Sequence, residues 1–382
     1  MAADPPGAAR VAIVHDWLTG MRGGERCLEV LCELFPQAPL FTLLHVPGSV
    51  TPVIERRRIV TSFVQRLPRA AERYRYYLPL FPLAVRQFDL SGYDLIVSMS
   101  HCVAKGVRVP PVALHLCHCF SPMRYIWERY DDYFVHGRGV AMRALMPPVA
   151  AALRRWDRRT ESVHHFIANS SYTADRIRRV YGRAADVIPS PVDVQRFEIA
   201  DAVDDYYLVV SALVPYKRVD LAIRAANRLR RRLLVVGTGP EEARLRVLAG
   251  PTVEFLGWRH DREVARLYAR CRAFLFPAVE DFGITPLEAA AAGRPTIALA
   301  RGGALETMVG LDANKPATAV FFKEQTVEAL VEAIHVFEAA ADRFDPKALR
   351  ARAGQFDRAV FKDQLLGYVD ARWREFRARQ AC

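Results

Sequence analysis

The sequence predicts an α/β protein built from two Rossmann-like domains. Short apolar strands alternate with amphipathic helical stretches along most of the chain. The strands are continuous Val/Ile/Leu runs, as expected for parallel sheets that are covered by helices on both faces. They also fall into two series of similar size, and 382 residues suffice for two domains of roughly 150–200 residues each.

The expected strands can be read off in order. In the first half they are VAIVH from Val11, LFTLLH from Leu40, YDLIVSMS from Tyr93, VALHLCH from Val112 and HFIANS from His165. In the second half they are YYLVVSA from Tyr206, RLLVVG from Arg232, TVEFLG from Thr252, AFLFPA from Ala273 and PTIALA from Pro295.

An irregular segment rich in Pro and Asp, Ile188–Asp205, separates the two series. We therefore expect one domain over residues 1–195 and a second over residues 196–360. Residues 361–382 have a helical pattern with no strand after it. This C-terminal helix has no partner fixed by the sequence, and packing back on the first domain is one option.

The bulk composition limits the class of protein. The net charge of +12 favours acidic ligands, an anionic membrane or nucleic acid as partners. Seven irregularly spaced cysteines, and no signal peptide in MAADPPGAAR, favour a reducing cytoplasm. The longest apolar run, YYLPLFPLAV, is interrupted by Pro79 and Pro82 and is too short to span a bilayer. We expect a cytoplasmic protein that is soluble or at most peripheral on the inner face of the membrane.

Two stretches are dense in arginine. Residues 55–75 also include Tyr74, with Tyr76 and Tyr77 directly after them, and Arg154–Arg159 reads RRWDRR. One interpretation is a solvated helix face. A second is a surface for anionic lipid. Nucleic acid ranks third, because the arginines match no nucleic-acid-binding module.

Two glutamates flank a turn in VEDFGITPLEAAAAGRP, which runs from Val279 to Pro295. Thr285 and Glu288 have capping-box spacing, with Pro286 at the first helical position, so Glu288 has a structural explanation. Glu280 has none. It follows a buried strand and precedes a helix start whose free N–H groups favour anions, which is where a parallel sheet places ligand groups.

Other loops that follow strands of the second series share this edge. Lys217 comes just after a strand, where a lysine can meet a diphosphate or simply be exposed. Gly237 and Gly239 form a G-x-G turn between a strand and a helix, which alone is weak evidence of a ligand. Gly302–Gly303 follows a strand, with Glu306 at a helix start, and is a further candidate cradle of backbone N–H groups for a ligand. Their coincidence on one edge predicts a ligand site there.

These features occur in a recognisable order. Lys217, GTGP, FLGW, EDFGITPLE with its E-x7-E spacing, and GGALE resemble the family-4 glycosyltransferases of GT-B architecture. In the first half, VHDWLTGMRGGERCLEVL and SSYTADRIRRVYG with VIPSPVDVQRF extend the resemblance over nearly the whole chain. It implies two Rossmann-like domains facing across a cleft, and retaining transfer from a nucleotide sugar.

The resemblance also implies residue roles. Glu280 would bind hydroxyls of the donor sugar, Glu288 the ribose, and Lys217 the leaving diphosphate. The other implied donor-binding residues are Gly23, Gly24, Arg218, Gly237, Gly239, Trp258, Arg259, Phe282, Gly283, Ile284 and Thr285.

Two positions depart from the family pattern. Ala212 stands where the family usually has an arginine five residues before the lysine, and Arg218 is a possible substitute. Ser190-Pro191-Val192-Asp193 replaces the usual N-G-V-D, which is a hinge segment.

The first half is implied to bind the acceptor. His118, at the end of VALHLCH, matches the family's active-site histidine, although a buried core histidine is the alternative. His101, with Lys105 nearby, is a weaker candidate. Arg124 and Tyr125 belong to the aromatic stretch SPMRYIWERYDDYF, which could contact an acceptor or form the core of a loop.

We expect no metal. HLCHC invites a zinc interpretation through His115, Cys117, His118 and Cys119, but alternation along a strand puts His118 on the opposite face from the others. No D-x-D motif occurs in the chain. The expected reaction is therefore metal-independent and needs no cofactor beyond the nucleotide sugar.

The combined expectation is a retaining hexosyltransferase of cell-surface polysaccharide assembly. The donor would be a GDP- or UDP-linked hexose, with mannose mildly preferred, and the acceptor a glycan or polyprenyl-linked glycan. The alternatives are a GT-B-like nucleotide-sugar epimerase and a non-catalytic relative that binds a ligand or a membrane; nucleic acid is not an expected partner.

Overall fold

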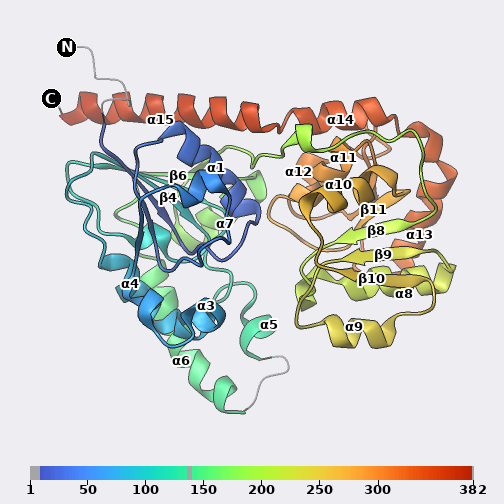
Figure 1. The fold of residues 1–382 in the computed structure, drawn as a ribbon, viewed down its shortest axis with the longest axis horizontal. Helices are drawn as coiled ribbons and strands as arrows, with labels where there is room; N and C mark the ends of the chain where they lie inside the picture. The colour runs from blue at the N-terminus through green and yellow to red at the C-terminus, as the bar shows by residue number, and fades with distance from the viewer. Residues whose placement is uncertain (1–8, 136–139, 381–382) are drawn as a thin grey trace. The chain divides into compact units, whose positions relative to one another are not determined.

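The computed structural model describes residues 9–135 and 140–380 and divides into two compact units (Figure 1). The first unit runs to Ser190 and resumes at Phe361, and the second is Pro191–Val360. Each unit has its own parallel sheet and its own buried apolar clusters. The prediction of two Rossmann-like α/β domains is confirmed.

The first sheet has seven parallel strands in the order β3-β2-β1-β4-β5-β6-β7. Their bounds are β1 Val11–His15, β2 Leu40–Thr42, β3 Ile59–Thr61, β4 Leu95–Ser100, β5 Leu114–Cys119, β6 His165–Ala168 and β7 Ala185–Val187. The chain reverses direction across the sheet between β1 and β4. A reversal of this kind marks the place where ligands usually bind at such a sheet.

Helices cover both faces of this sheet. The α-helices of the unit are α1 Gly23–Leu34, α2 Pro52–Glu55, α3 Ala70–Arg73, α4 Phe81–Arg86, α5 Tyr130–Phe134, α6 Val140–Asp157, α7 Ser171–Tyr181 and α15 Arg358–Gln380. The 3₁₀ turns are η2 Phe63–Arg66, η3 Tyr74–Leu80 and η4 Ala104–Gly106. Alternate residues of β1 face opposite ways: Val11 and Ile13 pack with α1 and α15, and Ala12 and Val14 pack with α4 and α6.

The last helix, α15, completes the first unit. Phe361, Leu365, Val369 and Trp373 recur every four residues, form one buried stripe, and pack on the same face of the sheet as α1 (Figure 1). The hydroxyl of Tyr368 donates to Asp186 at 2.7 Å, which ties the helix to β7. The boundary between the two units thus lies inside α15.

The second sheet has six parallel strands in the order β10-β9-β8-β11-β12-β13. Their bounds are β8 Tyr207–Val210, β9 Leu233–Val236, β10 Val253–Gly257, β11 Ala273–Phe276, β12 Thr296–Leu299 and β13 Ala319–Phe322. The α-helices are α8 Val219–Leu229, α9 Glu242–Leu248, α10 Asp261–Arg270, α11 Ile284–Ala291, α12 Ala304–Thr307, α13 Val327–Ala339 and α14 Pro346–Gly354, with 3₁₀ turns η5 Val194–Arg196, η6 Pro215–Lys217 and η7 Ala341–Arg343. Here the direction reverses between β8 and β11.

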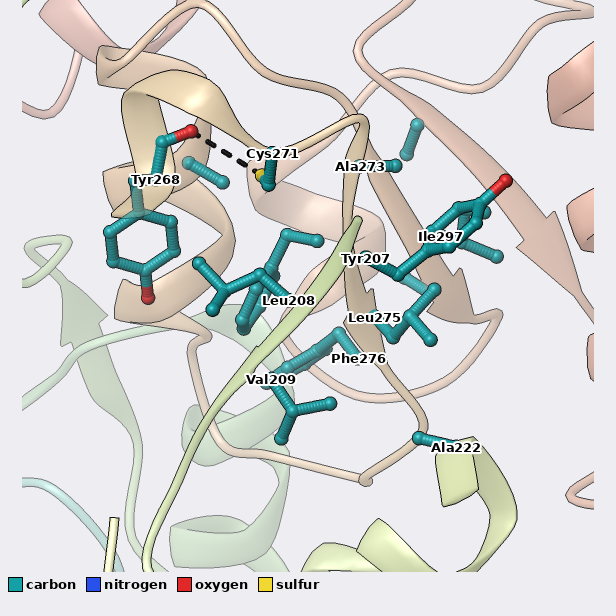
Figure 2. Packing of buried hydrophobic residues seen from close by; sticks show 14 of the residues in the cluster. Tyr207, Leu208, Val209, Ala222, Tyr268, Cys271, Ala273, Leu275, Phe276 and Ile297 are labelled. Carbon is teal, nitrogen blue, oxygen red and sulfur yellow. Dashed lines mark hydrogen bonds between the residues drawn. The ribbon is translucent and has the colours of Figure 1, made fainter. Parts of the chain in front are cut away.

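A single apolar cluster forms the core of the second unit. Figure 2 shows strand residues such as Leu208, Leu275 and Ile297 packed with Tyr268 and Cys271, and all of them are fully or almost fully buried. The thiol of Cys271 donates to the carbonyl oxygen of Tyr268 at 3.3 Å (Figure 2). This core holds the carboxyl ends of β8 and β11 in fixed positions.

The structure adds three short strands to the ten that the sequence predicts: β3, β7 and β13. Each lies at the outer edge of its sheet. The interpretation of residues 55–75 as one solvated helix face is wrong, because Ile59–Thr61 pairs with β2 and short turns make up the rest of the segment.

In the part of the chain that the structure describes, no helix is both long enough and apolar enough to cross a membrane.

Candidate functional site

An ion pair spans the point where the second sheet reverses direction. Lys217 lies at the end of the loop after β8, and Glu280 lies in the loop after β11. The Lys217 Nζ and Glu280 Oε1 atoms are 2.6 Å apart, with side chains 21% and 16% exposed. The cation and the carboxylate that the sequence predicted separately are therefore brought together at the ligand edge of the sheet.

The two glycines after β12 fix the backbone of Glu280. Glu280 pairs with Gly302 in a parallel bridge, and the N–H of Gly303 donates to the carbonyl oxygen of Glu280 at 2.9 Å. A Cβ at Gly302 would lie 2.4 Å from that same oxygen. The N–H of Gly303 thus holds Glu280 in place, whereas the sequence suggested a cradle for a ligand.

The capping box expected at Thr285 and Glu288 is absent, and that prediction is wrong. Helix α11 begins at Ile284, two residues before the predicted first helical residue Pro286, with Gly283 at the cap in a left-handed conformation of φ 92°. Glu288 does not reach back to the cap; one of its carboxylate oxygens accepts a hydrogen bond from the Tyr268 hydroxyl at 3.2 Å. The first-turn N–H groups of α11 consequently lie directly after the Glu280 loop.

Gly237 and Gly239 allow the loop after β9 to pack closely against the loop after β8. A Cβ at Gly237 would lie 1.9 Å from the carbonyl oxygen of Ser211, and one at Gly239 would lie 2.3 Å from that of Leu213. The N–H of Leu213 donates to the Thr238 carbonyl oxygen at 3.0 Å. The glycines therefore let the loop after β9 support the loop that carries Lys217.

Arg218 is held by protein groups. Its guanidinium donates to Asp220 at 3.1 Å and to the Gln325 side chain at 3.3 Å, and its backbone is left-handed with φ 52°. The amide of Gln325 in turn donates to the carbonyl oxygen of Pro277, at the end of β11. Arg218 therefore has protein partners, and its substitution for the arginine missing at Ala212 stays a prediction.

Trp258 and Arg259 follow the edge strand β10 on the same side of the sheet. The Trp258 side chain is 63% exposed, and its ring packs edge-on against His260 with centroids 4.4 Å apart. The guanidinium of Arg259 donates to the Trp258 carbonyl oxygen. Strands β9 and β8 separate these residues from the Glu280 loop.

The first unit carries a related pairing where its own sheet reverses. Asp16, just after β1, is fully buried and accepts the backbone N–H groups of residues 101–104 at 2.6–2.9 Å. His101 Nδ1 also lies 3.1 Å from Asp16. Burial, with the nearby charge of Asp16 opposing it, lowers the pKa of His101 to about 4. His101 is therefore neutral at pH 7 and only partly exposed.

Gly23 and Gly24 open helix α1 beside this cluster. A Cβ at Gly24 would lie 3.3 Å from the Phe120 ring and 3.7 Å from the His15 ring. Glu25, in the next position, caps the helix by accepting the N–H of Arg22, and it lies 3.5 Å from His15. Burial alone would raise the pKa of Glu25, but the hydrogen bond and charge of His15 bring it below its usual value.

His118 is buried without a hydrogen-bond partner among the described residues. Both ring nitrogens are unpaired, and the ring packs against Phe120 and Phe361 with centroids 4.8 and 5.9 Å away. Burial lowers the pKa of His118 to about 3. Two unpaired nitrogens in a neutral ring are costly, so this is not a satisfied core histidine.

Lys105 has a structural role that the sequence did not reveal. Its Nζ is fully buried, lies 2.7 Å from Asp157 Oδ1, and packs over the Trp156 and Tyr181 rings. The other oxygen of Asp157 accepts the Trp127 indole N–H and the Tyr181 hydroxyl. Asp157 is the one acidic residue in the basic stretch RRWDRR. That isolated negative charge was the sequence feature that could have indicated a buried partner for Lys105.

Arg124 and Tyr125 lie in the loop that this network holds. Tyr125 packs on the buried cluster that contains Met123 and Ile126, and its ring meets Tyr133 edge-on at 4.8 Å. Burial raises the pKa of Tyr125 well above its usual value. Both side chains are half-buried, and their contact with an acceptor stays a prediction.

Among residues 9–135 and 140–380, no group of three or more His, Cys, Asp or Glu side chains is arranged to hold a metal ion.

Comparison with known proteins agrees with this geometry. A model described as Glycosyltransferase Family 4 matches residues 21–196, and one described as Glycosyl transferases group 1 matches residues 194–354. A GDP-mannose-dependent alpha-mannosyltransferase of Mycobacterium tuberculosis is 32% identical over 381 residues, covering 96% of this chain and 85% of that protein. The chain belongs to glycosyltransferase family 4.

Two further comparisons concern one more relative and one solved structure. A Corynebacterium glutamicum protein, a GDP-mannose-dependent monoacylated alpha-(1-6)-phosphatidylinositol monomannoside mannosyltransferase, is 30% identical over 62% of this chain. The match spans 65% of that relative's length, somewhat less than two thirds. Sucrose-phosphate synthase of Thermosynechococcus elongatus has the same fold, with a TM-score of 0.70 over 97% of this chain and 99% of that one, at 19% identity.

Proposed function

We propose that this glycosyltransferase moves a hexose, preferably mannose, from a nucleoside diphosphate sugar to a glycan or lipid-linked acceptor with retention of configuration. The Lys217–Glu280 pair at the reversal point of the second sheet carries the proposal. A cation and a carboxylate there, beside the start of α11, match a donor that has both a diphosphate and hydroxyl groups. The GDP-mannose-dependent relatives support GDP-mannose as the donor.

Donor binding would exchange partners within this pair. The diphosphate takes Lys217 as its cation, and the released carboxylate of Glu280 accepts hydrogen bonds from sugar hydroxyls. Backbone N–H groups of Phe282, Gly283, Ile284 and Thr285 lie along the sugar and the diphosphate. Glu288 receives the ribose.

The chemistry then follows from where charge develops. The bond between the anomeric carbon and the β-phosphate oxygen breaks, and its electron pair leaves with the nucleoside diphosphate. The acceptor hydroxyl oxygen bonds to the anomeric carbon on the same face, and its proton passes to the departing phosphate oxygen. Fixed donors at the developing charge are each worth about 3–4 kcal/mol.

The first unit would recognise the acceptor and the sugar. The two unpaired nitrogens of His118 support a hydrogen bond from its ring to a sugar hydroxyl. His101, neutral and held by Asp16, with Arg124 nearby, would meet the acceptor. No resident metal or cofactor is part of the proposal, because the chain lacks a D-x-D motif.

The deciding experiment is a thermal-shift titration with GDP, UDP, ADP and dTDP and their hexose conjugates, with EDTA, followed by product analysis. Binding at a hundredfold excess over Kd stabilises the fold by ~2.7 kcal/mol. We expect a shift with GDP that grows with GDP-mannose, and glycoside formation with EDTA present. Interconversion of the sugar without transfer would support an epimerase, and no shift with any nucleotide would support a non-catalytic relative. Each of these results would overturn the proposal.

We further propose peripheral association with an anionic membrane. Residues 74–86 bury one face, including Tyr74, Leu78 and Phe81, and leave Tyr76, Leu80 and Leu83 36–68% exposed on the other. Between residues 56 and 86 the chain has eight arginines and only one acidic residue, Glu72. Exposed apolar side chains with cations around them suit an anionic lipid surface.

Vesicle co-sedimentation tests this surface. We expect binding to vesicles of phosphatidylglycerol and phosphatidylcholine, weaker binding to phosphatidylcholine alone, and loss of binding when Tyr76, Leu80 and Leu83 are all changed to Ser. Val247→Ser is the matched control, because Val247 is 86% exposed on α9 of the second unit. Binding that ignores the anionic lipid content, or equal loss in the control, would remove the membrane proposal.

A further inference from the structure

Tyr268 joins the buried core of the second unit to one of the proposed donor-binding carboxylates. It lies near the end of α10, and its side chain is 0% exposed. The ring packs against Phe274 and Phe197, with centroids 5.4 and 5.9 Å away, in the cluster of Figure 2. Its hydroxyl donates to Glu288 Oε2 at 3.2 Å.

Packing of the core fixes the position of the Tyr268 ring in this contact. A ring enclosed by the strand residues of the core has one available rotamer, so its hydroxyl has one available position. Burial, followed by the charge of Glu288, raises the pKa of Tyr268 well above its usual value. The hydroxyl therefore stays protonated and remains a donor throughout the working pH range.

The contact acts on a long side chain. Glutamate has several rotatable bonds and loses more rotamer freedom on ordering than most residues. An anchored carboxylate loses less of that freedom when a ligand arrives, so it binds more tightly for the same contacts. An oxygen atom set in the core thus determines where the carboxylate lies.

We propose that Tyr268 is a positioning residue: its hydroxyl fixes the Glu288 carboxylate in the orientation that receives the ribose hydroxyls of the donor nucleotide. This inference rests on the proposed donor role of Glu288. It assigns Tyr268 no contact with the nucleotide itself. Loss of its hydroxyl therefore weakens only the part of nucleotide binding that involves the ribose hydroxyls.

The test compares two nucleotides on each variant. Equilibrium Kd values for GDP and for 2′,3′-dideoxy-GDP give a ribose preference, the ratio of the second to the first. We expect the unmodified protein to prefer GDP and Tyr268→Phe to lose roughly 5- to 10-fold of that preference, within the range of a typical net hydrogen bond. Binding of the dideoxy nucleotide should not change.

Two further variants isolate the mechanism. Tyr206→Phe is the matched control, because Tyr206 is 4% exposed and its hydroxyl also bonds to α10, at the Leu267 carbonyl oxygen 2.8 Å away, with no link to Glu288. It should lose stability comparably and keep the ribose preference. In a Glu288→Gln background, Tyr268→Phe should have much less effect on that preference.

The possible failures are distinguishable. If the unmodified protein binds neither nucleotide, the proposed function fails, and this inference fails with it. If it prefers GDP but Tyr268→Phe weakens both nucleotides equally, Tyr268 has only a structural role. An unchanged preference in Tyr268→Phe, or an equal effect in the Glu288→Gln background, also overturns the inference.

Discussion

At the scale of single residues, the Lys217–Glu280 pair sets the order of events at the site. The Lys217 Nζ and Glu280 Oε1 atoms are 2.6 Å apart, and both side chains have limited exposure. In the proposed function a donor would separate them, and the separated groups would meet different parts of it. The two substitutions should consequently have different kinetic effects.

We expect Glu280→Ala to lower turnover of the nucleotide sugar by about 10²-fold or more while leaving the Kd for the bare nucleoside diphosphate nearly unchanged. Lys217→Ala should raise that Kd itself, because it removes the cation for the diphosphate. Steady-state kinetics with calorimetry of the diphosphate measure both quantities. Equal losses of turnover and diphosphate affinity in Glu280→Ala would contradict the sugar role.

Lys105→Met should destabilise the first unit by about 3–5 kcal/mol, because it leaves the Asp157 carboxylate buried without its cation. Urea unfolding followed by tryptophan fluorescence measures this. Arg10→Met is the control: it also removes an Arg/Lys–Asp pair, but the Arg10 side chain is 66% exposed, so little change is expected. Similar effects of the two changes would contradict the reading of Lys105 as a buried anchor.

At the scale of elements, every central strand was readable from sequence, whereas three of the four edge strands were not. Buried strands such as Leu233–Val236 are continuous apolar runs. Edge strands have a neighbour on one side only and tolerate polar residues, as in Ala185–Val187, where Asp186 binds α15. Ile59–Thr61 follows three arginines, which masked its pairing with β2.

The site shows the same division. Lys217, Glu280 and the glycines each follow a strand of the second sheet, so their place on one sheet edge could be predicted from the order of strands and loops. Partners distant in sequence were not predictable: Asp16 binds residues 101–104, and Tyr268 binds Glu288. Such contacts depend on tertiary packing, which leaves no local pattern in the chain.

The stripe of α15 gives a prediction at this scale. Leu365→Ala should destabilise the first unit by about 2–5 kcal/mol, since it opens a cavity against the sheet. Leu366→Ala is the neighbouring control, because Leu366 is 43% exposed, and its effect should be small. Chemical unfolding of the two variants decides the matter; equal losses would mean that the helix does not cover the sheet as described.

At the scale of the whole molecule, the histidines whose pKa is lowered by folding lie in the first unit. Within the described residues, every histidine with a resolved pKa shift lies in the first unit, and each shift is downward: His101, His115, His118, His164 and His165. The unfolded chain then binds more protons than the folded one below the ordinary pKa near 6.5. Stability of this unit is complete above that pH and falls as pH drops toward 4.

We expect the first unit to lose stability between pH 6.5 and 5, ahead of most carboxylate titration. Four of the five tryptophans report on it, namely Trp17, Trp127, Trp156 and Trp373. Burial lowers the pKa of His118 to about 3, so unfolding lets this side chain bind at most one more proton in this pH range. His118→Leu should therefore reduce the slope of the unfolding free energy against pH by at most ~1.4 kcal/mol per pH unit. An unchanged slope would show that His118 takes up its proton without unfolding.

The return of the chain to the first unit at Phe361 has a consequence for biosynthesis. Residues 191–360 are contiguous, so the second unit is complete on the ribosome before the first one is. The face of the first sheet that receives Phe361, Leu365, Val369 and Trp373 stays uncovered until those residues have left the exit tunnel. During translation the earlier half of the polypeptide therefore finishes folding last, and until then it presents an apolar sheet face to chaperones.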